Sequence, residues 1–251
     1  MQNKKLIRGG TGMNDKKIPK IINYCWFGGK PLPLEVKKCI KSWKKYCPDY
    51  EIIEWNEKNY NVMRHPFVQS AYKAKAWAFV SDYARLQIVY ENGGIYFDTD
   101  IELVKPIDDL LDCDFYIGIQ QGNKFPTTGL GFGAVKGNPI VLEMMQEYEG
   151  IKYSVSNREM ITCPRLNSKV IYKHGYIFND DVWKSDEMVV YPGRFFDPLA
   201  PGKTKNLLCK DTYSIHHYAA SWTSKFNVLK RKLYRIIGED KICKIKSMLK
   251  L

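Results

Sequence analysis

Residues 81–100 read SDYARLQIVYENGGIYFDTD and decide the fold. Their first part continues a predicted helix that begins before Ser81, with one apolar stripe formed by Phe79, Tyr83, Leu86 and Tyr90. The glycines in residues 92–94 end that helix, and residues 95–97 follow as a short apolar strand. The strand leads directly into acidic residues, so a helix, a short strand and the Asp98-Thr99-Asp100 motif are expected in succession.

The segments on either side continue this alternation. Strands are expected over residues 18–26, 50–55, 95–97, 115–120 and 130–135, and helices over 34–46, 67–90 (in two pieces) and 139–149. Alternating strands and helices predict an α/β fold with a mostly parallel sheet flanked by helices. Such sheets bind ligands beyond the carboxyl ends of their strands. Trp26 and the Asp98-Thr99-Asp100 motif both follow predicted strands.

The paired acids Asp98 and Asp100 are a candidate metal site. In an extended backbone, residues two apart point to the same side, so both carboxylates could face one cation. Carboxylate oxygens without a neighbouring His or Cys favour Mg²⁺ or Mn²⁺, and such an ion can bind a diphosphate. The alternative, two acids in a solvated turn, remains open from this motif alone.

Two further groups of polar residues have candidate roles. Asp82 and Arg85 lie three apart on one helix face among apolar neighbours. They could bind sugar or ribose hydroxyls, or form only an ion pair. His216 and His217 form the second group and shortly precede Ser221 and Trp222. A histidine here could ligate a metal, contact a phosphate or serve only a structural role.

Composition and charge limit the class of protein. The chain has 251 residues, 45% of them hydrophobic, which is enough for one sizeable core. Its seven cysteines lack C-x-x-C spacing, which favours reduced packing cysteines in a cytoplasmic protein. The formal net charge of +12 is concentrated in residues 37–45 and 225–250 and points to an anionic partner.

Three regions are expected along the chain: a flexible lead (1–16, with Met13 as a second candidate start), a catalytic domain (17–224) and a basic amphipathic helix (225–251). Apolar and basic faces in residues 225–251 suit a helix on an anionic bilayer, or one packed on the domain. No signal peptide or spanning segment is apparent in the sequence. The expected location is the cytoplasm, peripheral to the inner face of the cell membrane.

Three stretches together resemble a family of retaining glycosyltransferases. They are IPKIINYCWFGG (18–29), SDYARLQIVYENGGIYFDTD (81–100) and HHYAASW (216–222). The family shares a sugar-binding region with a DXD motif and includes bacterial capsular polysaccharide transferases, fungal Golgi α-mannosyltransferases and clostridial toxin glucosyltransferase domains. The resemblance implies the glycosyltransferase A-type fold, which has a Rossmann-like nucleotide-binding sheet. It also implies a nucleoside-diphosphate sugar donor, and Mn²⁺ or Mg²⁺ as cofactor.

The resemblance also implies roles for individual residues. Trp26 would stack on the nucleobase, Asp82 and Arg85 would hold donor hydroxyls, and Tyr96 would lie along the nucleotide. Asp98 would meet ribose and metal-bound water, while Asp100 would ligate the metal directly. Ser221 and Trp222 would contact the diphosphate, with His217 as a further metal ligand. Asn23 stands near the position where the family often carries a histidine.

The resulting prediction is a metal-dependent retaining enzyme of surface or capsular polysaccharide synthesis. It would transfer a hexose from a nucleotide sugar, with UDP favoured as the nucleotide, to a saccharide or lipid-linked oligosaccharide acceptor. An aspartate-metal phosphohydrolase is one alternative, because such enzymes also place D-x-D after a strand. A non-catalytic nucleic-acid binder is the second, but the interleaved exposed aromatics typical of that class are missing, so no nucleic-acid partner is expected.

Overall fold

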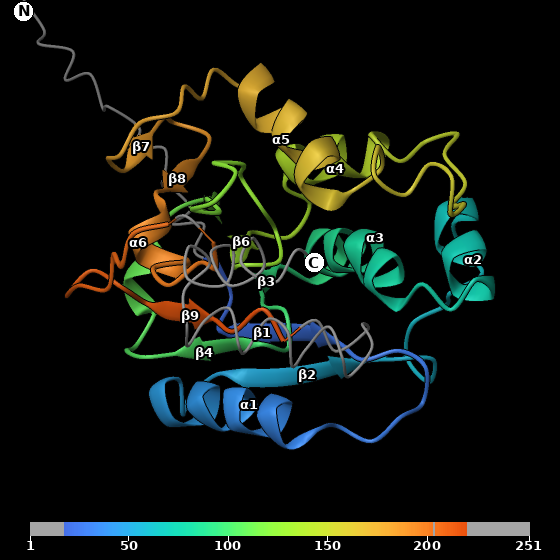
Figure 1. Cartoon of the computed structure of the whole chain (residues 1–251), viewed down its shortest axis with the longest axis horizontal. Coiled ribbons are helices and arrows are strands. Elements are labelled where there is room, and N and C mark those ends of the chain that lie inside the picture. Colours follow the sequence, from blue (N-terminus) through green and yellow to red (C-terminus); the bar gives the residue numbers. More distant parts are fainter. Residues whose placement is uncertain (1–17, 203, 220–251) are drawn as a thin grey trace, which may run out of the picture.

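A computed structural model describes residues 18–202 and 204–219 and has a seven-stranded sheet at its centre (Figure 1). The strand order is β2 (Glu51–Trp55), β1 (Ile21–Cys25), β3 (Gly94–Tyr96), β6 (Phe132–Ala134), β5 (Phe115–Gly118), β8 (Val189–Tyr191) and β7 (Trp183–Lys184). Five of the seven strands run in one direction, while β6 and β7 are reversed. The predicted α/β class with a mostly parallel sheet is confirmed.

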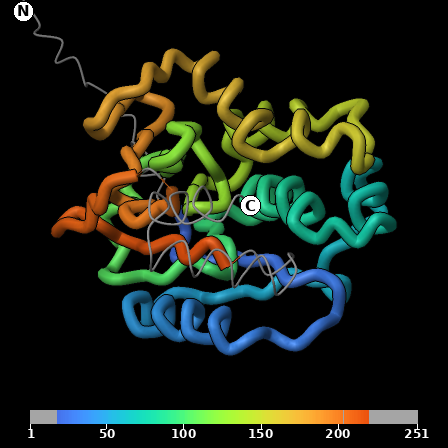
Figure 2. Tube along the Cα trace, viewed as in Figure 1, coloured from blue at the N-terminus to red at the C-terminus, as the bar shows by residue number. Residues whose placement is uncertain are grey.

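Helices cover both faces of the sheet (Figure 1). They are α1 (Leu34–Tyr46), α2 (Pro66–Lys73), α3 (Trp77–Asn92), α4 (Pro139–Gln146), α5 (Cys163–Lys173) and the short α6 (Gly193–Phe196), with a 3₁₀ turn at Asp108–Leu110. The trace in Figure 2 shows α1 along one side of the molecule and α3, α4 and α5 along the other. The sheet is therefore the middle layer of three.

Side-chain alternation along the strands separates two hydrophobic cores. In β1 and β3, Ile22, Tyr24 and Ile95 face the core that contains α1, whereas Cys25 and Tyr96 face the core that contains α3. Helix α1 contributes four buried side chains at helical spacing: Val36, Cys39, Ile40 and Trp43. Both faces of these strands are buried, as expected for a sheet between two helical layers.

Asn23 joins three neighbouring strands of the sheet, β2, β1 and β3. Its fully buried amide Nδ2 donates to the carbonyls of Gly93 (3.4 Å) and Ile95 (3.3 Å), and its Oδ1 accepts from Trp55 Nε1 (2.9 Å). The residue that departs from the family pattern thus has a structural function, because it satisfies polar groups from β2, β1 and β3 at one point.

A small ribbon lies beside the main sheet. Strand β4 (Ile101–Leu103) pairs in antiparallel fashion with β9 (Ser214–His216), and α1 packs against β4. The indole Nε1 of Trp43 in α1 donates to the carbonyl of Ile101 at 2.7 Å. This ribbon brings the last described residues next to the acidic motif (Figure 1).

Most predicted elements agree with the structure to within a few residues, including the division of residues 67–90 into α2 and α3. One expectation is wrong. Asp98 and Asp100 are not in extended backbone, because Thr99 and Asp100 form a turn in which the Ile101 amide donates to the Asp98 carbonyl (3.1 Å). The turn, and not strand periodicity, sets the directions of the two carboxylates.

Candidate active site

The acidic motif lies at the carboxyl edge of the parallel strands. Tyr96 ends β3 and Asp98 lies two residues further along. The neighbouring parallel strand β1 leads to Trp26. The Tyr96 hydroxyl donates to Asp98 Oδ1 at 3.2 Å, and the Asp98 amide donates to the Gly129 carbonyl at 3.1 Å. Sequence reasoning placed Asp98 and Trp26 at this edge, and the structure does the same.

Arg85 connects helix α3 to the acidic motif. Its Nη2 lies 2.9 Å from Asp82 Oδ1 and 3.2 Å from Asp98 Oδ1, and its guanidinium packs over the Tyr96 ring at 4.9 Å. The side chain of Arg85 is only 5% exposed, compared with 13% for Asp82 and 33% for Asp98. A cation this buried is held by two carboxylates together, which fixes the position of both.

Burial sets the protonation of these acids. It raises the pKa of Asp82 to about 6, against the opposing effect of Arg85 and with a further rise from Asp98. Burial also raises the pKa of Asp98, again opposed by Arg85 and reinforced by Asp100. Two carboxylates with raised pKa values around one arginine form a site that can accommodate additional positive charge.

Asp100 faces the C-terminal segment. Its Oδ2 accepts from the Ala219 amide at 2.8 Å and lies 3.4 Å from His216 Nε2. Burial opposes ionisation of Asp100, but His216 and these hydrogen bonds hold its pKa below the usual value. His217, the histidine that the resemblance favoured as a metal ligand, instead places Nε2 2.7 Å from Glu102 Oε2. Consecutive residues at the end of β9 face opposite sides, so His216 is the histidine beside Asp100.

Residues outside the predicted motifs complete the surroundings of Asp82 and Asp98. Thr128 Oγ1 lies 2.9 Å from Cys163 Sγ, and Arg85 Nη1 points to the same sulfur at 3.9 Å. At Gly129 a Cβ atom would lie only 2.3 Å from Asp98 Oδ2, so the absence of a side chain makes room for this carboxylate. No local sequence pattern indicates these residues, because they come from the segment before β6 and from α5, far along the chain.

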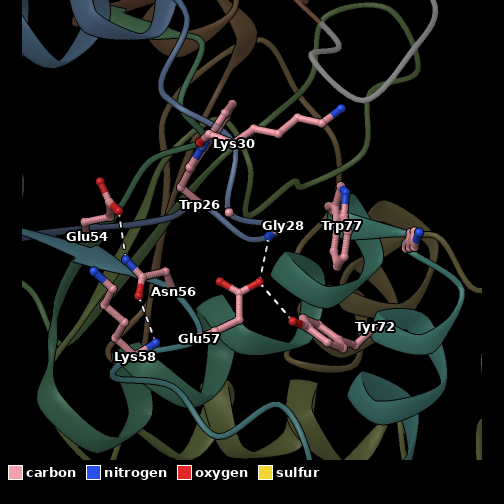
Figure 3. Close-up of a pocket in the computed structure, with 11 residues that line it drawn as sticks. Trp26, Gly28, Lys30, Glu54, Asn56, Glu57, Lys58, Tyr72 and Trp77 are labelled. Atoms are coloured by element: carbon pink, nitrogen blue, oxygen red, sulfur yellow. Dashed lines mark hydrogen bonds between the residues drawn. The ribbon is translucent and has the colours of Figure 1, made fainter.

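An open cleft of about 830 Å³ lies beyond β1 and β2 (Figure 3). Trp26, the glycines Gly28 and Gly29, Glu57 and Trp77 are among its lining residues. Gly28 has a φ of +92°, and a Cβ there would lie 2.7 Å from the Trp77 ring, so only glycine allows this close approach. Because β1 and β3 are adjacent and parallel, this cleft and the acidic motif share one edge of the sheet.

The acids and His216 are suitable partners for a divalent cation. Asp98 Oδ2 accepts no hydrogen bond from the described residues, and Asp100 lies close enough to raise the pKa of Asp98. Oxygen ligands suit Mg²⁺ or Mn²⁺, and Mn²⁺ also accepts an imidazole nitrogen. In the described part of the chain, no three His, Cys, Asp or Glu side chains are grouped to hold an ion by themselves. Oxygens of a bound diphosphate would have to complete the ligand set.

Several predictions concern residues outside the described ranges. Ser221, Trp222, the flexible lead (1–16) and the basic segment (225–251) all lie there. Within the described residues, no helix is both long and apolar enough to span a bilayer.

Comparison with known proteins tests the family resemblance. Residues 33–116, from just before α1 into β5, match the family described as "Glycosyltransferase sugar-binding region containing DXD motif". This segment includes Asp82, Arg85, Asp98 and Asp100. The predicted resemblance is confirmed over the part of the chain that carries the acidic motif.

Two curated relatives are also glycosyltransferases by name. Inositol phosphoceramide mannosyltransferase 3 of Schizosaccharomyces pombe is 24% identical over 67% of this chain, which spans only 45% of that protein. The "Uncharacterized glycosyltransferase L373" of Acanthamoeba polyphaga mimivirus is 24% identical over 89% of both chains. A solved glycosyltransferase involved in glycosylation of the major capsid of PBCV-1 aligns with a TM-score of 0.47 at 14% identity, covering 87% of this chain and 100% of that one.

The class of protein that these comparisons indicate is a glycosyltransferase. More particularly, residues 33–116 are similar to the glycosyltransferases that contain the DXD motif, and both curated relatives carry a glycosyltransferase name. The alternatives of an aspartate-metal phosphohydrolase and a non-catalytic nucleic-acid binder are set aside, because the matches are to glycosyltransferases.

Proposed function

We propose that the chain transfers a hexose, with retention of configuration, from a nucleoside-diphosphate sugar to a saccharide acceptor. UDP is the favoured nucleotide, and Mn²⁺ or Mg²⁺ is the cofactor, held by Asp98, Asp100 and His216 only together with oxygens of the donor diphosphate. The acceptor would be a saccharide or lipid-linked oligosaccharide of a capsule or other surface polysaccharide. The mannosyltransferase relative supports a hexose as the transferred group.

One observation carries this proposal: Arg85 joins Asp82 to Asp98 at the same sheet edge as the cleft next to Trp26. A nucleotide sugar has a base, a diphosphate and a polyhydroxylated ring in sequence. The cleft offers an aromatic wall for the base, the acids offer a cation site for the diphosphate, and the Asp82–Arg85 pair offers acceptors and donors for sugar hydroxyls.

The protein side chains would act by positioning the donor. Asp82 and Arg85 would orient the sugar, and Trp26 would hold the base, so that the anomeric carbon stays next to the acceptor hydroxyl. A bound cation would supply charge stabilisation of the leaving diphosphate. No residue of the site is marked as a covalent nucleophile. Departure and attack on the same face of the sugar therefore account for retention, with Ser221 and Trp222 proposed to contact the diphosphate.

The decisive experiment is a screen of UDP- and GDP-sugars with Mn²⁺ for slow donor hydrolysis and for transfer to saccharide acceptors. Asp100→Ala should abolish both activities while leaving the unfolding transition cooperative. Asp186→Asn changes an exposed acid and should behave as the wild type. Full activity of Asp100→Ala would refute the metal site, and inactivity of the wild type on every nucleotide sugar would refute the proposed reaction.

A membrane-associated acceptor would explain the basic segment 225–251. We propose that it places the enzyme at the inner face of the cell membrane, a proposal that rests on its sequence pattern alone. Flotation with vesicles containing anionic lipid, with and without residues 225–251, tests it. Equal binding by both forms would dismiss this role.

A further inference from the structure

We infer that Glu57 determines which nucleobase the enzyme binds. Its Oε2 accepts a hydrogen bond from the ring N–H of the donor nucleobase, which in uracil is N3–H. This inference rests on the proposed function, because it requires the cleft beside Trp26 to hold the base. It adds a residue outside every motif that the sequence indicated. Glu57 lies two residues beyond β2, at the same edge of the sheet as the acidic motif.

Glu57 is fixed in place through only one of its two oxygens (Figure 3). Oε1 accepts from the Gly28 amide at 2.7 Å and from the Tyr72 hydroxyl at 3.1 Å. Gly28 belongs to the turn after β1 and Tyr72 to α2, so two different elements hold this oxygen. Oε2 accepts no hydrogen bond from the described residues, and in Figure 3 it is turned away from Tyr72, toward Asn56.

The other acid that lines the cleft has no such free oxygen. Glu54 Oε2 accepts from the Tyr24 hydroxyl at 2.8 Å, and its Oε1 accepts from Asn56 Nδ2 at 2.8 Å. The Oδ1 of Asn56 in turn accepts from the Lys58 amide at 2.9 Å. Glu54 and Asn56 are therefore occupied by protein partners. Of the two glutamates that line this cleft, only Glu57 has an oxygen available to a ligand.

The aromatic residues nearby explain why a base would reach this oxygen. Trp26 and Trp77 both line the cleft, and Trp77 packs against Tyr72 with ring centroids 5.2 Å apart. A planar base stacked on an indole presents its edge, not its face, to neighbouring side chains. An ionised carboxylate only accepts hydrogen bonds, so its partner must be a donor, and the donors on the edge of a base are N–H groups. Uracil has one such group on its ring, at N3.

The test compares UDP with 3-methyl-UDP, in which a methyl group replaces the N3 proton. Binding to the full chain is measured by calorimetry in the presence of Mn²⁺. For the wild type, methylation should weaken binding about 10- to 100-fold, the loss expected for one hydrogen bond to a charged acceptor. Equal binding of the two nucleotides would overturn the assignment of Glu57 and leave the proposed function standing.

The matched variant is Glu57→Gln, which keeps an oxygen for Gly28 and Tyr72 but replaces the free oxygen with an amide donor. UDP binding should weaken about tenfold or more, and the penalty for 3-methylation should disappear. Glu54→Gln is the control and should retain the full penalty. A Glu57→Gln variant that binds UDP normally and still rejects 3-methyl-UDP would show that Glu57 only supports the turn at Gly28.

If UDP does not bind to the wild type, GDP and 1-methyl-GDP are compared in the same way, since guanine also has a ring N–H. Selective loss of 1-methyl-GDP binding would support the role of Glu57 with a different base. Failure of both nucleotides to bind would overturn the proposed function, and this inference with it.

Discussion

The guanidinium of Arg85 lies 3.2 Å from the carboxylate of Asp98, so helix α3 and the DXD motif are in direct contact. The same nitrogen, Nη2, also contacts Asp82 at 2.9 Å. A substitution in the helix therefore changes the electrostatic environment of the proposed metal site, and the two motifs form one unit.

Arg85→Ala should be strongly destabilising. It removes the buried counterion of two carboxylates, for which a loss of about 3–5 kcal/mol in unfolding free energy is expected. Arg64→Ala removes an exposed ion pair with Glu91 and should cost less than about 1 kcal/mol. Urea unfolding of both variants provides the measurement. Similar losses for the two would show that Arg85 does not hold buried charge.

Asp82→Asn should change the pH dependence of stability. Burial raises the pKa of Asp82 from 3.8 in the unfolded chain to about 6 in the folded state, so the folded protein binds the proton more tightly than the unfolded chain. Its contribution to stability is therefore lost as pH rises from about 4 to 6. Relative to the wild type, the Asn variant should gain about 2 kcal/mol between pH 4.5 and pH 7.5. Urea unfolding of the wild type and the variant at both pH values tests this. A variant whose stability relative to the wild type is higher at pH 4.5 than at pH 7.5 would contradict it. Transfer activity should fall, because the carboxylate is lost.

Gly129→Ala should displace the Asp98 carboxylate. The added Cβ would lie 2.3 Å from Asp98 Oδ2 and 3.1 Å from Arg85 Nη1. We expect a loss of about 1–3 kcal/mol in stability from overpacking, with a large loss of activity. At Gly122 a Cβ meets nothing within 4 Å, so Gly122→Ala is the matched control. Transfer activity and urea unfolding are measured for both glycine variants. Wild-type activity of Gly129→Ala would show that the Asp98 carboxylate can move without loss of function.

His216 and His217 can be separated by their dependence on Mn²⁺. His216 lies beside Asp100 and is 16% exposed, whereas His217 is 35% exposed and pairs with Glu102. His216→Ala should raise the Mn²⁺ concentration for half-maximal activity about tenfold or more. His217→Ala should change it less than about twofold, as for loss of an exposed pair. The reverse order would restore the assignment suggested by the family resemblance.

Much of the fold could be predicted because its elements have strong local patterns. Helix α1 was expected at its observed bounds, since its buried residues recur at helical spacing between lysines. The reversal of β6 could not be foreseen, because strand direction depends on pairing with β3 and β5 and not on the residues of β6. Strands β4 and β9 were missed, since each has only three residues and their partners are more than 100 positions apart.

The site was predictable where its residues share one stretch of sequence. Asp82, Arg85 and Asp98 occur within 17 residues, and the structure brings them into contact. The sequence does not identify Glu57 and Gly129 as site residues, because each one matters only through its contact with a segment far away in the chain. The sequence alone does not decide whether His216 or His217 faces Asp100, since a register shift of one residue in the strand exchanges the two faces.

The reversed direction of β6 has a consequence for where the site obtains its residues. In a uniformly parallel sheet, only the segments that leave the strands reach the carboxyl edge. Because β6 runs opposite to β3, the segment that enters it also arrives there, which is how Gly129 meets Asp98. The connection over residues 121–128 can therefore be redesigned to reshape the surroundings of the acids while every strand keeps its register.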